Sequence, residues 1–207
     1  MPSKTVNPRN YVTDIVTFSY AHVFEPKKTP SGDMKYSVCL LLDKKNKKVK
    51  ERWDAAIEAA FQAGVKKGKF NKKQRPIIKT PVRDGDKELE TGVKEEESYR
   101  GKWFINASSF DPIEVTTAKN GKVIQLFDAK DFFSGCYGRA IISFYPYNKE
   151  GGRGIAVALN GIFKVGEGDR LDGRVNASKV FSDFVDEVPE TETEDMPEEE
   201  TEDDGPF

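Results

Sequence analysis

The sequence predicts a mainly β domain that is followed by an acidic tail. Aromatic residues make up 11% of the chain, and 17 glycines allow tight turns between strands. Apolar residues mostly alternate with polar ones at the two-residue period of a strand, and only one segment follows the period of a helix. Residues 180–207 contain thirteen Asp or Glu and no Lys or Arg. We therefore expect one body domain at 1–179 and a tail at 180–207.

The acidic tail explains why the whole chain is almost neutral. The chain has 33 basic and 35 acidic residues, so the body keeps all 33 basic and 22 acidic ones and carries +11, against −13 on the tail. A segment this acidic cannot bury enough apolar area to offset its ordering entropy, and we expect it to be disordered. A solubilising role is the simpler interpretation, but it does not explain an aromatic terminus. The chain ends with Asp203, Asp204, Gly205, Pro206 and Phe207.

The sequence pattern in the first part of the body predicts two strands and one helix. Residues 1–10 are polar and form an expected loose arm, and strands are expected at 11–24 and 34–42, with a turn at 26–32. The helix is expected at about 47–67, where apolar residues recur at spacings of three and four. Its apolar stripe consists of Val49, Trp53, Ala56, Ile57, Ala60, Phe61 and Val65. The opposite face is rich in lysine, and we interpret it as a solvent-exposed face.

The composition of residues 68–101 predicts a long connection without regular structure. The first half of this segment is basic and the second half is acidic. A loop of this length inside a compact domain is usually functional or mobile. We expect it to lie over a groove.

The remainder of the body predicts strands separated by turns. They are expected at 102–108, 113–117, 123–127, 136–147 and 155–165. Asn120 and Gly121 stand between two extended runs, which is the strongest short signal for a hairpin. A basic, glycine-rich turn at 148–154 joins the last two strands, and we expect these two to pair antiparallel.

The strand at 136–147 carries the most informative pattern of side chains. One face is small and apolar and is expected to face the core, and it consists of Cys136, Gly138, Ala140, Ile142 and Phe144. The other face consists of Tyr137, Arg139, Ile141, Ser143, Tyr145 and Tyr147. Rings that alternate with arginine, next to Lys149 and Arg153 on the adjoining turn, suit the stacking of bases and the binding of phosphates. The alternative is that the tyrosines pack beneath residues 68–101 as a second small core.

Catalytic and metal-binding interpretations find little support in the sequence. The single histidine, His22, has no evident partner for acid–base chemistry, and one histidine with two separated cysteines cannot form a Cys/His zinc site. Cys39 and Cys136 lie in apolar runs and are expected to be small core residues rather than a disulfide. The carboxylates around Asp84 and Asp128 could hold a metal, but a turn explains each more simply. We expect no catalytic residue, metal or cofactor.

Two segments resemble a known family of proteins. KWFINASS at 102–109 and FSGCYGRAIISFYPY at 133–147 are similar to blocks of a family of phage-encoded single-stranded-DNA-binding proteins. The resemblance implies an OB-fold, a five-stranded barrel that binds single strands without sequence preference. OB-folds often place their helix after the third strand, whereas here it is expected after the second. The tail resembles the acidic tails of bacterial single-stranded-DNA-binding proteins, which end in Pro-Phe and bind replication proteins.

Together these observations predict a protein that binds and protects single-stranded DNA during phage replication, recombination and repair. The expected DNA-binding residues are Lys35, Lys102, Phe104, Tyr137, Arg139, Tyr145, Tyr147, Lys149 and Arg153. The tail residues expected to bind a polymerase, helicase or primase are Asp203, Asp204, Pro206 and Phe207. We expect this tail to compete with DNA for the body. A homo-oligomer is possible.

No apolar run is long enough to span a bilayer, and the expected location is the cytoplasm of the bacterial host. Two alternative functions stay open. One is a protein-interaction hub or recombination mediator, and the other is a metal-dependent nuclease.

Overall fold

The computed structural model describes residues 9–149, 152–171, 173, 181 and 184. The chain divides into two compact units, Met1–Arg174 and Val175–Phe207. In the second unit the rings of Phe181 and Phe184 pack edge to face, with centroids 6.3 Å apart. The predicted disorder of the tail and its partner-binding residues Asp203, Asp204, Pro206 and Phe207 lie outside the described residues.

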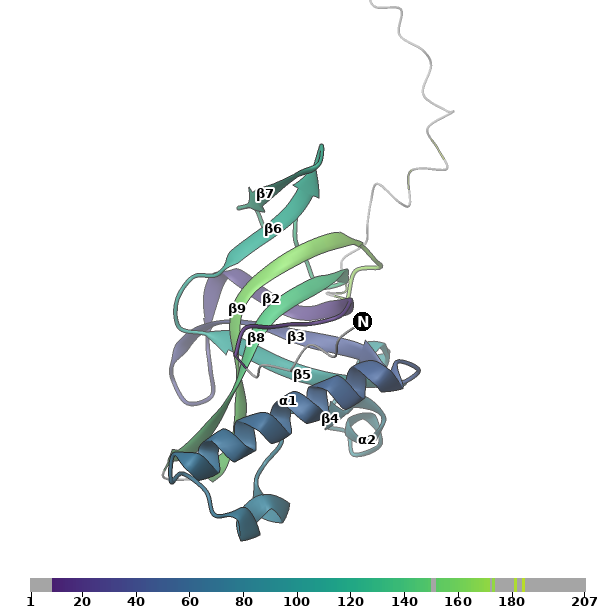
Figure 1. Ribbon diagram of the computed structural model, residues 1–207. Coiled ribbons are helices and arrows are strands. Elements are labelled where there is room, and N and C mark those ends of the chain that lie inside the picture. The colour runs from purple at the N-terminus through teal and green to yellow at the C-terminus, as the bar shows by residue number, and fades with distance from the viewer. Residues whose placement is uncertain (1–8, 150–151, 172, 174–180, 182–183, 185–207) are drawn as a thin grey trace, which may run out of the picture. The chain divides into compact units, whose positions relative to one another are not determined.

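Five strands of the first unit form a closed ring (Figure 1). In chain order they are β2 (Val16–Lys28), β3 (Met34–Asp43), β5 (Lys102–Ser109), β8 (Cys136–Lys149) and β9 (Gly152–Glu167). The ring runs β2–β3–β5–β9–β8 and returns to β2, and all neighbours pair antiparallel except β5 and β9, which are parallel. This is the five-stranded OB-type barrel that the resemblance predicted, although its seam between β2 and β8 is short.

Smaller strands extend the barrel at its edges. β1 (Tyr11–Val12) pairs with β8, and β4 (Arg83–Asp84) pairs with β5. β6 (Glu114–Lys119) and β7 (Lys122–Leu126) form a hairpin that projects from the barrel and joins it through the parallel pairing of β6 with β9 (Figure 1). Asn120 and Gly121 turn this hairpin with φ angles of 52° and 73°, so the predicted Asn-Gly turn is confirmed.

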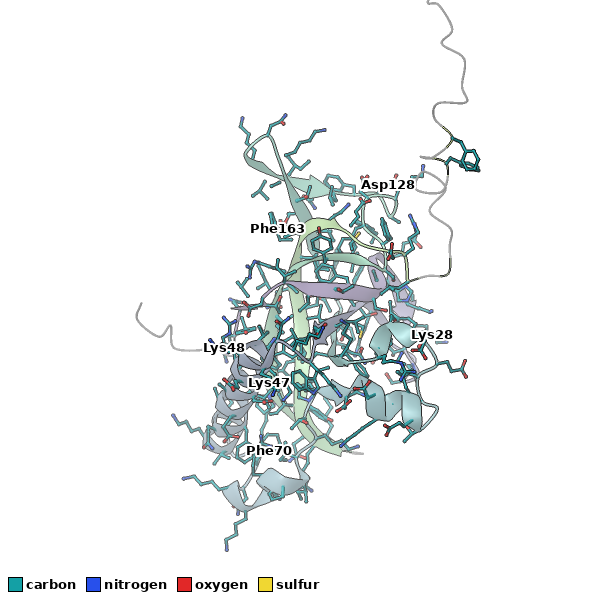
Figure 2. The ribbon with its side chains drawn as sticks, turned by 90° about the vertical axis from the view of Figure 1, so that its right-hand side faces the viewer. Lys28, Lys47, Lys48, Phe70, Asp128 and Phe163 are labelled. Carbon is teal, nitrogen blue, oxygen red and sulfur yellow. The ribbon has the colours of Figure 1, made fainter. Side chains whose placement is uncertain are left out.

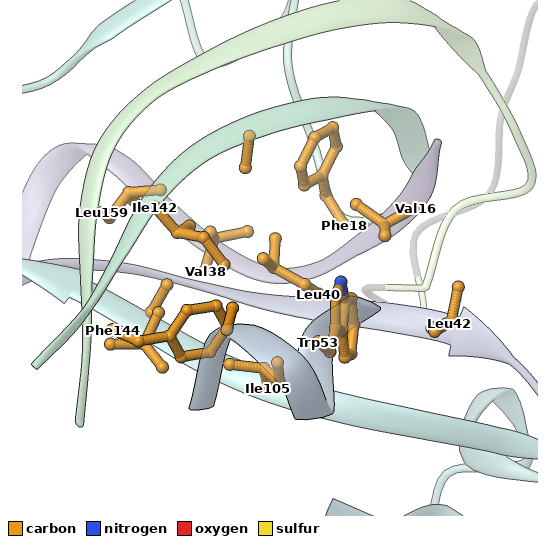
Figure 3. Packing of buried hydrophobic residues seen from close by; sticks show 14 of the residues in the cluster. Val16, Phe18, Val38, Leu40, Leu42, Trp53, Ile105, Ile142, Phe144 and Leu159 are labelled. Carbon is orange, nitrogen blue, oxygen red and sulfur yellow. The ribbon is translucent and has the colours of Figure 1, made fainter. Parts of the chain in front are cut away.

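The predicted amphipathic helix is confirmed as α1 (Lys47–Lys66), which stands between the second and third strands of the barrel. Figure 1 shows α1 lying across one end of the barrel. Its buried residues Trp53 and Phe61 belong to the same apolar cluster as the barrel interior, and Figure 3 shows Trp53 facing Leu40 and Ile105. The helix therefore closes one opening of the barrel with its apolar stripe.

Residues 68–101 contain more structure than the sequence indicated. They include a 3₁₀ helix, η1 (Lys72–Ile77), the helix α2 (Gly85–Glu90) and a second 3₁₀ helix, η2 (Glu97–Tyr99). The sequence did not indicate α2, because a helix of 6 residues is too short to show a period. The N-terminus of α2 is capped by Asp84, whose carboxylate accepts a hydrogen bond from the backbone N–H of Asp86 at 3.0 Å. The ammonium group of Lys44 forms ion pairs with the side-chain carboxylates of Asp84 and Asp86.

The two faces of β8 are divided as the alternation predicted. The five residues expected to face inward are all buried, whereas Tyr137, Arg139, Ile141 and Tyr145 are exposed and Ser143 and Tyr147 are half-buried. The four of these that have side chains belong to the main core together with Val16, Phe18 and Leu159, and Figure 3 shows Ile142 and Phe144 in that cluster. Both cysteines are buried free thiols, Cys136 in the main core and Cys39 in a second apolar cluster, which confirms that they are core residues.

A second apolar cluster covers part of the outer surface of β3 and β5. It consists of Cys39, Leu41, Tyr99 and Phe104, and burial raises the pKa of the Cys39 thiol to about 11. The rings of Tyr99 and Phe104 meet edge to face with centroids 4.9 Å apart, and Phe104 has no exposed area. The expectation that Phe104 contacts DNA is therefore wrong, because residues 83–100 fold over this face of the barrel and enclose the ring.

Replacing Phe104 with alanine should destabilise the protein rather than weaken a surface contact. Loss of a fully buried phenyl ring costs about 3–5 kcal/mol in the free energy of unfolding. The matched control is Phe127→Ala, since Phe127 is 76% exposed and its loss should change stability by about 0.5 kcal/mol or less. Urea denaturation measures both. Equal stability of the two variants would contradict the burial of Phe104.

Candidate nucleic-acid interface

The outer face of the β8–β9 hairpin carries tyrosine rings that lie across glycines. Tyr147 pairs with Gly154, and a Cβ atom added to that glycine would lie 2.9 Å from the tyrosine ring. A Cβ atom on Gly166, the partner of Tyr137, would lie 2.5 Å from that tyrosine's hydroxyl oxygen. Because the glycines have no side chain, the rings rest against the sheet rather than stand upright from it. This packing fixes the rings.

Tyr145 is the most exposed tyrosine on this hairpin. It faces Ala156 across the pair of strands, and 45% of it is exposed. Burial, and then the neighbouring Tyr147, raise the pKa of its hydroxyl. The side chain therefore stays uncharged at neutral pH and does not repel a phosphate. The second small core that was the alternative for these tyrosines is built instead by Tyr99 and Phe104.

A row of small or polar side chains crosses the outer surface of the barrel. Cross-strand pairing places His22 opposite Ser37, Ser37 opposite Ser108, Ser108 opposite Ala158, and Ala158 opposite Ser143. Each member is half-buried, and each stands next to a residue of the main core, so the row faces outward. We call these five residues the small-residue row. It runs across the strands from β2 to β8 and leaves room for a ligand close to the sheet.

The position of this row matches the surface that OB-folds use for oligonucleotides. In that fold the second and third strands, with the loops that join strands one to two and four to five, form the binding face. In this barrel these are β3 and β5, the turn between β2 and β3, and the β8–β9 hairpin. Residues 83–100 cover the half of this face near Phe104 and leave the half with the row open.

One end of β3 adds a cation and a ring beside the row. The ammonium group of Lys35 lies 4.3 Å from the centroid of the Phe110 ring, and Asp33 lies 3.6 Å from the same group. Phe110 is 67% exposed. The pair thus offers a positive charge and a flat apolar surface to solvent.

Basic side chains gather where α1 ends and the β8–β9 hairpin turns. The ammonium group of Lys69 donates to the carbonyl of Pro146 at 3.0 Å, and Asn148 donates to the carbonyl of Lys69 at 3.1 Å. Lys79 pairs with the backbone of Arg153 and Ile155 along β9. We call this group the basic end, and Figures 1 and 2 show α1, η1 and the hairpin meeting there, with Phe70 among them. Its members, all exposed, are Lys66, Lys67, Lys69, Lys72, Lys73, Lys79, Lys149 and Arg153.

Two other predicted DNA-binding residues, Lys102 and Arg139, interact with groups of the protein. Lys102 pairs with Asp43 at 2.9 Å, and it lines a hollow of about 240 Å³ together with Tyr137. Arg139 is exposed, but its guanidinium donates to the carbonyl of Thr13 at 2.9 Å. The structure therefore brings Tyr145, Tyr147, Lys149 and Arg153 together near the turn of the β8–β9 hairpin. Tyr137 and Arg139 lie at the opposite end of β8, and Lys35 and Lys102 lie on β3 and β5. Their contact with DNA stays a prediction.

Sequence reasoning did not select several residues of this surface. The lysines of the basic end at 66–79 form a run of positive charge in the sequence, and this run is the signal that could have assigned them to the interface. Phe110 could have been found as a lone aromatic beside a turn. The small-residue row had no local signal, since its members come from five strands.

The described residues show no arrangement suited to metal chemistry. They contain no group of three or more His, Cys, Asp or Glu side chains placed to hold an ion. Asp84 and Asp86 pair with Lys44, and Asp128 accepts the N–H of Lys130 at 2.8 Å in a turn. The helices of the described chain are too short or too polar to cross a membrane.

Comparison with known proteins places the chain in a family. The chain is 27% identical over 164 residues to putative protein p50 of Acyrthosiphon pisum secondary endosymbiont phage 1, covering 76% of this chain and 84% of that protein. Its fold is similar to that of the C-terminally truncated single-stranded DNA-binding protein from bacteriophage Enc34. The TM-score is 0.65 at 21% identity, over 82% of this chain and 96% of the other.

The same Enc34 protein in complex with single-stranded DNA gives a TM-score of 0.62 at 22% identity, over 84% of this chain and 98% of the other. The sequence model of the family described as the ssDNA-binding protein of Enterobacter phage Enc34 matches residues 9–196. The chain belongs to this family of phage single-stranded-DNA-binding proteins.

Proposed function

We propose that the protein binds single-stranded DNA without sequence preference, along the small-residue row and the β8–β9 hairpin. The observation that carries this proposal is the alignment of the row in register across five strands, with Tyr145 and Tyr147 beside it on β8. Small side chains let a strand approach the sheet, and exposed rings stack on bases. Every base has a flat face, so stacking tolerates any sequence.

The basic end supplies the electrostatic part of binding. Its eight lysine and arginine residues lie where the hairpin carrying Tyr147 turns, so phosphates next to a stacked base meet positive charge. Cations that neutralise phosphates release counterions, and affinity then falls as salt rises. Duplex DNA hides its base faces inside the stack, and the rings therefore favour unpaired strands.

This binding serves the replication, recombination and repair of phage DNA in the host cytoplasm, without catalysis by the protein itself. The tail recruits a replication protein through Phe207 and the preceding acids, and it occupies the basic surface of the body when DNA is absent. A tethered segment acts at high effective concentration and needs no fixed structure for this. Opposite charges of −13 on the tail and +11 on the body support the proposal.

Replacing Tyr145 and Tyr147 with alanine should weaken binding of oligo-dT. Each stacked base contributes roughly 1–3 kcal/mol, so loss of both rings should raise Kd by tenfold or more. Fluorescence anisotropy at fixed salt measures the change. Phe127→Ala is the control because it removes a ring that is even more exposed than Tyr145, at the end of the β6–β7 hairpin. If the double variant binds like the control, the tyrosine face is not the binding face.

A Kd of the unaltered protein for oligo-dT that is weaker than about 10⁻⁴ M would favour the alternative function as a protein-interaction hub.

Replacing Lys149 and Arg153 with alanine should make binding less sensitive to salt. Each phosphate contact to a single strand contributes about 0.7 to the slope of log K against log salt, so the slope should fall by about 1.4. The control is the double variant Lys119→Ala and Lys122→Ala, which removes two exposed charges from the β6–β7 turn. A titration of Kd against salt concentration provides the slope. An equal fall in both double variants would mean that overall charge, rather than the hairpin, binds the phosphates.

Deleting residues 183–207 should tighten binding to single-stranded DNA at low salt. Removing most of the negative charge of the tail removes the competitor for the basic surface, and the gain should shrink as salt screens the attraction. Comparing the Kd of the full and shortened chains at two salt concentrations tests this. Unchanged affinity at low salt would exclude competition by the tail.

A further inference from the structure

A hollow of about 600 Å³ lies beside β2, where the seam of the barrel opens. β2 pairs with β8 near its start, and beyond that point a loop takes the place of β8. The N–H of Gly135 donates to the carbonyl of Phe18 at 2.8 Å, and the N–H of Ala21 donates to the hydroxyl of Ser134 at 3.2 Å. These bonds hold the loop against β2 and form one wall of the hollow.

Tyr20 stands at an irregular point of β2 on the edge of this hollow. The register of β2 against β3 shifts between Ser19 and His22, and Tyr20 adopts a φ of +47°. This region is strained for a bulky side chain, whereas bulges in strands often redirect a side chain toward a binding site. The ring lines the hollow, and 42% of Tyr20 is exposed. Strain of this kind persists where the surrounding structure enforces it, and it is concentrated at functional sites.

Neighbouring side chains hold the Tyr20 ring in place. Its hydroxyl donates to the carboxylate of Glu96, and the ammonium group of Lys94 lies 4.2 Å from the ring centroid. Both neighbours belong to the segment that covers the adjacent face of the barrel. The ring is thus positioned before any ligand arrives, which lowers the entropy lost on binding.

The hollow is positively charged. Among the described residues that line it, Lys27, Lys130 and Arg170 are cations and Glu96 is the one carboxylate. The guanidinium of Arg170 lies 4.0 Å from the centroid of the Phe133 ring, so a cation and a ring share one wall. Positive groups of this kind attract phosphate.

The hollow is continuous with the small-residue row. His22 lines the hollow and is also the β2 member of the row. Burial, and then the charge of Lys27, lower the pKa of its imidazole, so His22 is neutral at pH 7 and can accept or donate a hydrogen bond. A strand that follows the row from β8 toward β2 therefore arrives at the opening of the hollow.

We propose that this hollow binds one nucleotide of a DNA strand, with the base against Tyr20 and the adjacent phosphate near Lys27, Lys130 and Arg170. This inference rests on the proposed function, and it adds a site where the path of the DNA strand along the small-residue row ends. The volume lies within the range of small-ligand sites, which is about 300–1,000 Å³. A ring with several cations suits a base and its phosphate, and the shared His22 favours DNA over a peptide as the occupant.

The experiment compares the full-length protein with Tyr20→Gly and Tyr20→Phe. Glycine removes the ring and accepts a positive φ without strain, so the fold should be preserved. We expect Tyr20→Gly to raise the Kd for a long oligo-dT about tenfold, with Tyr20→Phe within about twofold of the unaltered protein. Photo-crosslinking to an oligonucleotide that carries 5-iodouracil should form an adduct at Tyr20, identified by mass spectrometry. Phe127→Ala is again the control for loss of an exposed ring.

Each other outcome overturns the inference in a distinguishable way. Unchanged affinity of Tyr20→Gly, with adducts at Tyr145 or Tyr147 alone, would remove the hollow from the interface and leave the proposed function intact. Tighter binding by Tyr20→Gly would mean that the hollow holds a competing segment of the chain rather than DNA. Failure of the unaltered protein to bind the oligonucleotide would overturn the proposed function together with the hollow.

Discussion

The two-residue alternation of β8 is the constraint on which the structure depends. Its inward side chains are small and apolar, and they pack with Phe18 and Leu159 to fill the barrel. Its outward side chains therefore lie on the surface, and they include three tyrosines and an arginine rather than only the usual Thr, Lys and Glu. A slip of one residue would bury Arg139 and expose Phe144, so packing of the core fixes the outer surface as well. The register of β8 that closes the barrel is therefore also the register that places its tyrosines on the outer surface.

The segments inserted into the barrel decide which part of the outer surface stays open. Residues 83–100 cover one half of the β3–β5 face with Tyr99 and Phe104, and α1 closes one end of the barrel. What stays open is the small-residue row, with Tyr145 and Tyr147 at one side and the Tyr20 hollow at its β2 end. The short seam between β2 and β8 leaves the space for that hollow.

Features set by neighbouring residues could be predicted from the sequence. The Asn120–Gly121 hairpin, the stripe of α1 and the faces of β8 all follow from local patterns, and all three are present. The five-stranded barrel required the resemblance to a family, because its closure depends on pairing between distant strands such as β5 and β9. Most strand boundaries differ from the expected ones by a few residues, as assigned strand ends usually do. The single strand expected at 11–24 is divided into β1 and β2, and β2 continues to Lys28 in the expected turn.

Features that depend on distant contacts could not be predicted in this way. Phe104 alternates like a surface residue, and only the folding of residues 83–100 over β5 encloses it. The small-residue row depends on register across five strands. The orientation of the Tyr20 side chain depends on an irregularity of β2 that no residue type in the local sequence indicates.

The most direct test of this account maps DNA onto the surface in solution. Chemical-shift perturbation by NMR during titration with oligo-dT would report each backbone amide separately. We expect the largest changes at Ser37, Ser108, Ala158 and Ser143 and along residues 145–149, with little change in the β6–β7 hairpin. Changes concentrated in that hairpin or on the exposed face of α1, with the row unaffected, would contradict it.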